Sequence, residues 1–140
     1  MRTISKVVTA EFIDYNQHVS EAAYYNISIR SLHELHEELG LNSLFWKHGV
    51  APIVFNSHID FLREMFMDEK MQINVEFESK SKNFRKWKRT LEILNGAKET
   101  AAMVVSEGAF FDLKKRKVCS PPTEIIDAFK NIGLLNRGSA

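Results

Sequence analysis

The sequence predicts an α+β fold in which a five-stranded antiparallel sheet wraps around one long central helix. Residues 21–39 show helical periodicity with one apolar face. Strand patterns precede this helix and follow it, and Asn95-Gly96 between the last two strand patterns is typical of a hairpin turn. A long helix with one apolar face must bury that face, and a single sheet offers the surface to do so.

The central helix has clear boundaries in the sequence. Ser20 is a suitable N-cap, and Glu21 places negative charge at the positive end of the helix dipole. Gly40 is a natural C-terminal stop. The predicted buried face consists of residues at helical spacing, namely Tyr25, Ile29, Leu32, Leu35 or His36, and Leu39.

The rest of the chain is predicted as strands, with a loop at 42–50 and a short final helix opened by Pro122. The expected strands cover residues 3–12, 53–62, 70–79, 83–94 and 100–113. The order is one strand, the long helix, four strands in antiparallel succession and a short helix. This arrangement is the hotdog fold.

Length and composition indicate one ordinary globular domain, expected at residues 1–136 with a loose tail at 137–140. A net charge of +1 gives no global electrostatic reason to expect nucleic acid or membrane as a partner. No apolar run is long enough to span a bilayer. Cys119 is the only cysteine, so no intramolecular disulfide forms and a cytoplasmic location is expected. The five histidines show no zinc-ligand spacing, and no metal is expected.

The segment just before the helix concentrates polar groups that are able to do chemistry. Asp14 is either a turn residue that bonds its own backbone or a carboxylate that attacks a carbonyl or activates water. Asn16 orients water or the carboxylate, or only satisfies the turn. His18 either holds the loop together or acts as an acid or a substrate contact. Ser20 is interpreted as the cap alone.

Two stretches of the sequence resemble a known family. Residues 14–25, DYNQHVSEAAYY, resemble the D-x-x-G-H-V-N-N-x-x-Y signature of 4-hydroxybenzoyl-CoA thioesterase-like hotdog enzymes. They are still more similar to the D-Y-N-G-H-M-S-E-A-x-Y form of thioesterases associated with carnitine and betaine metabolism. Residues 56–64, NSHIDFLRE, resemble the E-T-H-x-x-x-L-R-E strand of the same enzymes. The chain departs from the pattern at Gln17, where the family has glycine, whose backbone angles glutamine reaches only with strain.

The resemblance implies an acyl-CoA thioesterase that hydrolyses a thioester to a free acid and coenzyme A. In that family the aspartate matching Asp14 is the nucleophile or general base, and a backbone N–H at the helix start, here that of Glu21, contacts the oxyanion. No cofactor is implied beyond the coenzyme A of the substrate. A homodimer or a dimer of dimers with active sites at the interface is expected. The alternative is a non-catalytic acyl-CoA-binding or sensing module on the same fold. A hotdog dehydratase is disfavoured because its His-led motif is not evident.

A basic stretch at residues 80–89, KSKNFRKWKR, is a candidate surface for the phosphates of coenzyme A. Arg85, Lys86 and Lys88 would contact phosphate, and Trp87 or Phe84 would stack on adenine. The alternative is a solvated hairpin. Single-stranded nucleic acid is disfavoured by the low net charge and by the fold.

Four further aromatic or imidazole groups are candidates for contact with the acyl group. Tyr24 and Tyr25, together with Trp46, are candidates to surround a quaternary ammonium group by cation–π contact, a prediction that rests on the subgroup resemblance. His58 lies in a strand pattern with Asn56 and Asp60 on one face. That face belongs either to a substrate pocket or to a sheet edge or interface.

Overall fold

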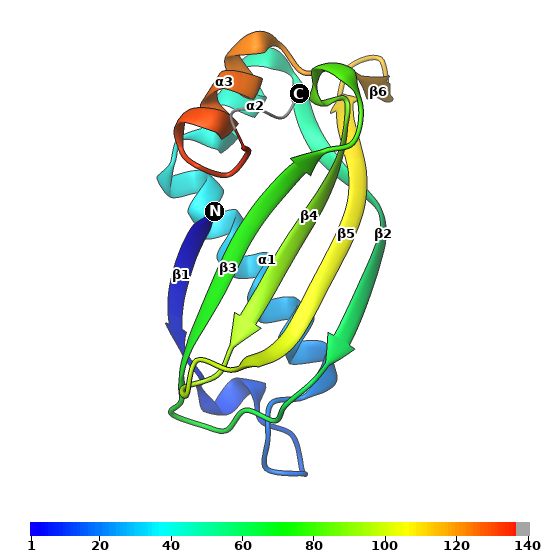
Figure 1. Cartoon of the computed structure of the whole chain (residues 1–140). Coiled ribbons are helices and arrows are strands. Elements are labelled where there is room, and N and C mark those ends of the chain that lie inside the picture. Colours follow the sequence, from blue (N-terminus) through cyan, green and yellow to red (C-terminus); the bar gives the residue numbers. More distant parts are fainter. Residues whose placement is uncertain (137–140) are drawn as a thin grey trace.

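The computed structural model describes residues 1–136, and the predicted tail at 137–140 lies outside these described residues. A curved antiparallel sheet wraps around one long helix, as the sequence predicts (Figure 1). The strand order is β1-β3-β4-β5-β2, with β6 paired to β5. The strands are β1 Arg2–Val7, β2 Val50–Phe61, β3 Lys70–Ser79, β4 Lys86–Leu94, β5 Thr100–Asp112 and β6 Lys117–Cys119. The helices are α1 Glu21–Glu38, α2 Leu41–His48 and α3 Thr123–Asn131, with short 3-10 turns η1 Ala10–Phe12 and η2 Lys82–Phe84.

The sheet has one strand more than the five predicted. The carboxylate of Asp112 accepts the backbone N–H groups of Lys114 and Lys115, at 3.0 and 2.9 Å. Arg116 then takes a left-handed conformation with φ of 56°. This tight turn returns the chain along the end of β5, where β6 pairs with Phe110, Phe111 and Asp112. The sequence did not predict β6, because a three-residue strand is too short to show a period.

Helix α1 begins and ends as predicted, but its buried face is rotated. The Ser20 hydroxyl accepts the N–H of Ala23 at 3.2 Å, and Gly40 follows the helix with φ of 76°. The buried residues are Ala23, Tyr24, Ile27, Ser28, Ser31, Leu32, Leu35 and His36, whereas Tyr25 and Ile29 are only half-buried. Two serines therefore lie on the face that packs against the sheet, and a search for apolar residues alone passes over them.

Other differences are local and have local causes. The predicted loop at 42–50 contains helix α2, and the first strand ends at Val7, before the 3-10 turn η1. The hairpin at Asn95-Gly96 is confirmed, but it is a five-residue connection rather than a two-residue turn. Asn95 Oδ1 accepts two backbone N–H groups across this connection, and the left-handed residue is Lys98 with φ of 63°.

The end of the core distant from the start of α1 encloses a histidine. His36 is 3% exposed and lies within 6.4 Å of the rings of Phe45, Phe77 and Phe129. Its Nε2 atom has no hydrogen-bond partner in the described chain. Burial lowers the pKa of His36 to about 4, and the charges of His33 and Arg89 act in the same direction. His36 is therefore neutral in the folded protein at neutral pH.

This burial predicts a pH dependence of stability. Between pH 6.5 and about 4 the unfolded state binds a proton at His36 that the folded state does not bind. The contribution of neutral His36 to the free energy of unfolding is thus fully present above pH 6.5. It decreases as the pH falls to 4, by up to about 3 kcal/mol. We expect His36→Leu to remove this part of the pH dependence in urea titrations. The exposed control His33→Leu should keep most of it, because burial is the larger cause of the lowered pKa. A wild-type profile in His36→Leu would contradict this assignment.

Candidate active site

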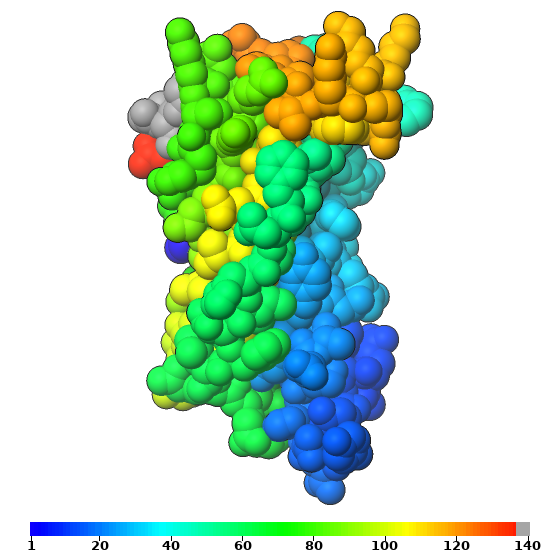
Figure 2. All heavy atoms as spheres, turned by 90° about the vertical axis from the view of Figure 1, so that its right-hand side faces the viewer, coloured from blue at the N-terminus to red at the C-terminus, as the bar shows by residue number. Residues whose placement is uncertain are grey.

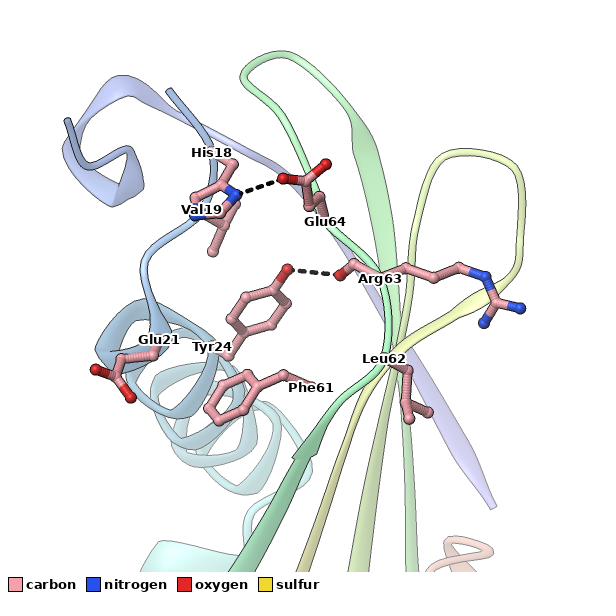
Figure 3. A pocket seen from close by; sticks show the side chains of 8 residues that line it. All are labelled: His18, Val19, Glu21, Tyr24, Phe61, Leu62, Arg63 and Glu64. Atoms are coloured by element: carbon pink, nitrogen blue, oxygen red, sulfur yellow. Dashed lines mark hydrogen bonds and ion pairs between the residues drawn. The ribbon is translucent and has the colours of Figure 1, made fainter. Parts of the chain in front are cut away.

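The candidate site lies where helix α1 begins and strand β2 ends (Figure 3). A cavity of about 300 Å³ opens there. The helix side and the strand side contribute four residues each, namely His18, Val19, Glu21, Tyr24, Phe61, Leu62, Arg63 and Glu64. The two motifs singled out in the sequence, 14–25 and 56–64, therefore meet at one cavity.

Asp14 does not line this cavity; it lies in a closed turn next to His18, which does. Its Oδ1 atom accepts the backbone N–H of Asn16 at 2.8 Å. This is the contact expected of a turn residue, one of the two roles that the sequence offered for Asp14. The backbone closes the turn through Gln17 N–H to Asp14 O at 2.9 Å and Asp14 N–H to His18 O at 3.0 Å. The Asp14 carboxylate thus has one oxygen engaged by the turn, and the other is oriented toward His18.

His18 lies between two carboxylates. Its Nδ1 is 2.9 Å from Glu64 Oε1, and its Nε2 is 3.8 Å from Asp14 Oδ2. Figure 3 shows the His18–Glu64 contact joining the loop to the end of the β2 segment. His18 therefore holds the loop in place, and it also connects Asp14 to Glu64. Glu64 was not among the predicted site residues, although it ends the second family-like motif.

The first turn of α1 presents unpaired N–H groups. Ser20 accepts the N–H groups of Ala23 and Tyr24, whereas those of Glu21 and Ala22 have no acceptor within residues 1–136. Both donors lie at the positive end of the helix dipole, where they favour an anion or a polarised carbonyl. The Glu21 side chain points away from Tyr24 and Glu64 (Figure 3), so Glu21 can contribute through its backbone.

Tyr24 forms the inner wall of the cavity. Its hydroxyl donates to the carbonyl oxygen of Arg63 at 2.9 Å, and its ring meets that of Phe61 edge to face with centroids 5.5 Å apart. Burial is the main cause that raises the pKa of the Tyr24 hydroxyl. Phe61 and Arg63 were not predicted as site residues. They lie far from Tyr24 in the sequence, and only the folded chain brings them to the start of α1.

Tyr24, Tyr25 and Trp46 do not come together within one chain to surround a quaternary ammonium group, as was predicted. Tyr24 is buried, and Trp46 is 85% exposed on α2, beyond the opposite end of α1. Tyr25 bonds the hydroxyl of Ser57 on β2 instead, at 3.1 Å.

His58 is not in the cavity. The pleat of β2 places it on the opposite face from Ser57, and its Nε2 is 3.0 Å from Asp60 Oδ1. Of the two interpretations of His58, the structure favours the exposed edge of the sheet over a pocket within one chain.

The predicted coenzyme A surface is divided by the structure. Trp87 and Phe84 are 1% and 0% exposed, so neither ring is free to stack on adenine. Lys86 and Lys88 face the side of the sheet away from α1, and Arg85 donates to the carbonyl of Val118 at 3.2 Å. The β3–β4 connection that carries these residues lies at the end of the sheet opposite the start of α1 (Figure 1). One chain alone does not bring them to the cavity.

Comparison with known proteins places this geometry in a family. The family model described as thioesterase-like superfamily matches residues 7–129. The chain belongs to the thioesterase-like superfamily. No curated protein matches the sequence.

Solved structures give the same fold at low identity. A Staphylococcus aureus hypothetical protein in complex with CoA has a TM-score of 0.80 and 16% identity, covering 92% of this chain and 81% of that one. A 1,4-dihydroxy-2-naphthoyl-CoA thioesterase from Synechocystis has a TM-score of 0.78 and 14% identity, covering 94% and 96%. A DHNA-CoA thioesterase from Staphylococcus aureus has a TM-score of 0.76 and 15% identity, covering 94% and 89%. The chain is similar to these proteins in fold.

Two kinds of feature are absent from residues 1–136. Among residues 1–136, no group of three or more His, Cys, Asp or Glu residues is arranged to hold a metal ion. Within the same residues, no helix has the length and hydropathy needed to cross a membrane.

Gln17 gives the first prediction from the site. It takes the left-handed conformation, with φ of 63°, that glycine adopts without strain. We expect Gln17→Gly to raise the free energy of unfolding by about 1 kcal/mol, measured by urea denaturation. Gln17→Ala, which keeps a Cβ atom, is the matched control and should not stabilise. A destabilised Gln17→Gly would show that the glutamine side chain contributes more than the backbone strain removes.

Proposed function

We propose that the protein is an acyl-CoA thioesterase whose catalytic carboxylate is Asp14. The observation that carries the proposal is the proximity of this carboxylate to His18, at 3.8 Å, in the wall of a cavity of about 300 Å³ that Glu21, the first residue of α1, also lines. Thioester hydrolysis requires a group that attacks or activates water, together with donors for the oxyanion. The loop and the helix start supply one of each.

The residues have separate roles in this proposal. The thioester carbonyl lies against the N–H groups of Glu21 and Ala22, which take up the negative charge of the oxyanion. In one route Asp14 attacks the carbonyl carbon, the C–S bond breaks to release the coenzyme A thiolate, and water then cleaves the resulting acyl-aspartate anhydride. In the other route Asp14 removes a proton from the water that attacks the carbonyl carbon and displaces the thiolate. The contacts of His18 with Glu64 and Asp14 orient the Asp14 carboxylate, and Asn16 fixes its other oxygen. No metal or cofactor is needed for these steps.

The alternative of a non-catalytic acyl-CoA-binding module rested on Gln17. Gln17 adopts the backbone angles available to glycine, and the turn from Asp14 to His18 is closed by backbone hydrogen bonds. The substitution therefore leaves the loop in a form that presents Asp14, which supports the enzyme over the binding module. Membership of the carnitine- and betaine-associated group and a cytoplasmic location remain predictions from the sequence.

We further propose that the working unit is a homodimer joined through strand β2. Among residues 1–136 this strand has no partner on its outer edge, and it runs along the surface of the molecule (Figure 2). It carries exposed apolar residues such as Val54, Phe55 and Phe61. Exposed strand edges are templates for pairing with another chain. A two-fold axis would pair β2 with its copy in antiparallel order. The basic connection of one copy would then approach the cavity end of the other, which supports a coenzyme A site shared between two chains.

Asp14→Asn tests the catalytic role. Asparagine keeps an oxygen that accepts the Asn16 N–H but loses the charge, so we expect turnover of acyl-CoA to fall by about 100-fold or more. Thiol release over a panel of acyl-CoA substrates measures this. Asp68→Asn is the matched control, because Asp68 lies in a left-handed turn that asparagine tolerates. Unchanged turnover in Asp14→Asn would remove Asp14 from the mechanism.

Val54→Lys tests the shared site. A lysine on the outer edge strand places like charges against each other across a two-fold interface, so we expect a dimer to become a monomer by light scattering and to lose activity. The control is Val7→Lys on β1, the opposite edge of the sheet, where the exposed fraction of valine is similar, 50% against 44%. A wild type that is monomeric at working concentration, yet active, would contradict the interface proposal.

A further inference from the structure

Strand β2 is divided by a β-bulge into two halves. Its register with β5 shifts between Val54 and Asn56, and Phe55 is the extra residue. An extra residue exchanges the faces to which the following side chains point. The residues that face α1 are Val50, Pro52 and Val54 before the bulge and Ser57, Ile59 and Phe61 after it. They are even-numbered in the first half of the strand and odd-numbered in the second half.

The bulge favours an end-to-end register for pairing β2 with a second copy of itself. Residues that lie directly opposite in an antiparallel pair point to the same face of the sheet. When Val50 of one copy lies opposite Phe61 of the other, each even-numbered residue of a first half meets an odd-numbered residue of a second half. Residues that face α1 then meet residues that face α1 along both halves. A register that joins only the second halves pairs residues 56–61 and leaves Val54 and Phe55 exposed, as they are in one chain.

The charges at the two ends of β2 favour the same register. The end beside the start of α1 carries the carboxylates of Asp14, Glu21, Asp60 and Glu64. Arg63 also lies there, but it pairs with Glu99 at 3.4 Å. At the other end Val50 pairs with Asp112, and the turn that follows carries four exposed cations at residues 114–117. End-to-end pairing therefore brings the basic end of one copy to the acidic end of the other.

The cavity at the start of α1 has walls from only two segments of the chain. Its eight lining residues lie within 18–24 and 61–64. Phe61 is 49% exposed, and β2 is the edge strand of the sheet among residues 1–136. One side of the cavity therefore ends at the unpaired edge of β2, where a second copy would lie.

Trp46 is an exposed aromatic side chain at the other end of β2. It lies on α2 with 85% exposure, whereas Phe45 beside it packs against His36 with ring centroids 6.0 Å apart. Helix α2 is thus on the same side of the sheet as α1, at the end of the molecule opposite the start of α1 (Figure 1). The N–H of Gly49 donates to Trp46 O at 3.2 Å, so Trp46 stays about one helical turn from Val50.

We propose that Trp46 of the partner subunit closes the open side of the cavity and contacts the apolar part of the acyl group. The proposal rests on the proposed thioesterase function and assigns a residue of the second copy to the same site. Directly opposite residues of an antiparallel pair lie about 5 Å apart, and one helical turn adds about 5 Å, so Trp46 of the partner subunit reaches the cavity edge at Phe61. The indole and the ring of Phe61 both leave water there. Two-fold symmetry completes both cavities in the same way.

Acrylamide quenching of tryptophan fluorescence tests the position of Trp46 without any substrate. The chain has two tryptophans, and Trp87 is 1% exposed, so quenching reports mainly on Trp46. We expect quenching in the wild-type dimer to be several-fold weaker than in the Val54→Lys monomer or in wild type diluted to the monomer. Trp46→Phe should remove this difference. Equal quenching in dimer and monomer, or a wild type that is monomeric at working concentration, would overturn the proposal.

Mixed dimers of Asp14→Asn and Trp46→Ala chains test the contact in the working site. If Trp46 serves the cavity of the partner subunit, each mixed dimer has one site with both changes and one site with neither. Activity per mixed dimer should then return to about half that of the wild type. If Trp46 serves its own chain, no site is intact, and activity that stays at or below that of the Trp46→Ala dimer would contradict the shared wall.

The single changes give the size and kind of the effect. We expect Trp46→Ala to lower kcat/KM for substrates with large apolar acyl groups by about 10-fold, mainly through KM, because an apolar wall binds substrate and transition state alike. Trp46→Phe keeps a ring and should retain most of the activity, and Val7→Ala on the opposite edge of the sheet is the control. Unchanged kinetics in Trp46→Ala would overturn the proposal. If no acyl-CoA is hydrolysed, the proposed function fails, and the quenching still decides where Trp46 lies.

Discussion

The packing of helix α1 into the curve of the sheet is the contact on which the rest of the structure depends. Each fully buried apolar side chain on its inner face, such as Ile27, Leu32 or Leu35, contributes about 1.5–3 kcal/mol. The buried serines Ser28 and Ser31 are small. This packing determines where the helix begins in relation to the strands, and therefore which strand end the first turn of α1 meets.

The loop before the helix is held mainly by backbone contacts. Val19 donates to Met65 O at 2.9 Å, and Ser20 donates to Phe12 O at 3.0 Å. These bonds anchor the end of the loop to two distant segments without requiring a particular side chain. A left-handed glutamine at position 17 is therefore tolerated, because strain of about 1–2 kcal/mol is small beside the contacts that close the turn. The turn from Asp14 to His18 therefore closes even though Gln17 stands where the family motif has glycine.

Local patterns explain what the sequence predicted. The ends of α1 follow from Ser20 and Gly40, and strand β3 has the predicted bounds because polar and apolar residues alternate along it. The part of the candidate site within 14–21 was predicted from the polar groups that precede the helix and from the resemblance of residues 14–25 to the family motif. Glu64 and Arg63 were not assigned roles, because their proximity to His18 and Tyr24 arises only when β2 ends beside α1. The six basic residues within 80–89 likewise look alike in the sequence. Only the strand register shows that Arg89 is buried, unlike the other five.

The fold alone gives no reason for a charge at position 89. A domain is stable by only about 5–15 kcal/mol, and a buried ion without a counter-ion lowers that margin by several kcal/mol. An apolar residue at this position would pack against Trp87 and Phe77 without that penalty. The guanidinium is stabilised instead by the cation–π contact with Trp87 and by donation to Ser106 on β5. Ser106 Oγ lies 2.7 Å from Ser57 Oγ on β2. The sheet face that packs against α1 therefore carries a polar line across three strands, from its centre to its outer edge.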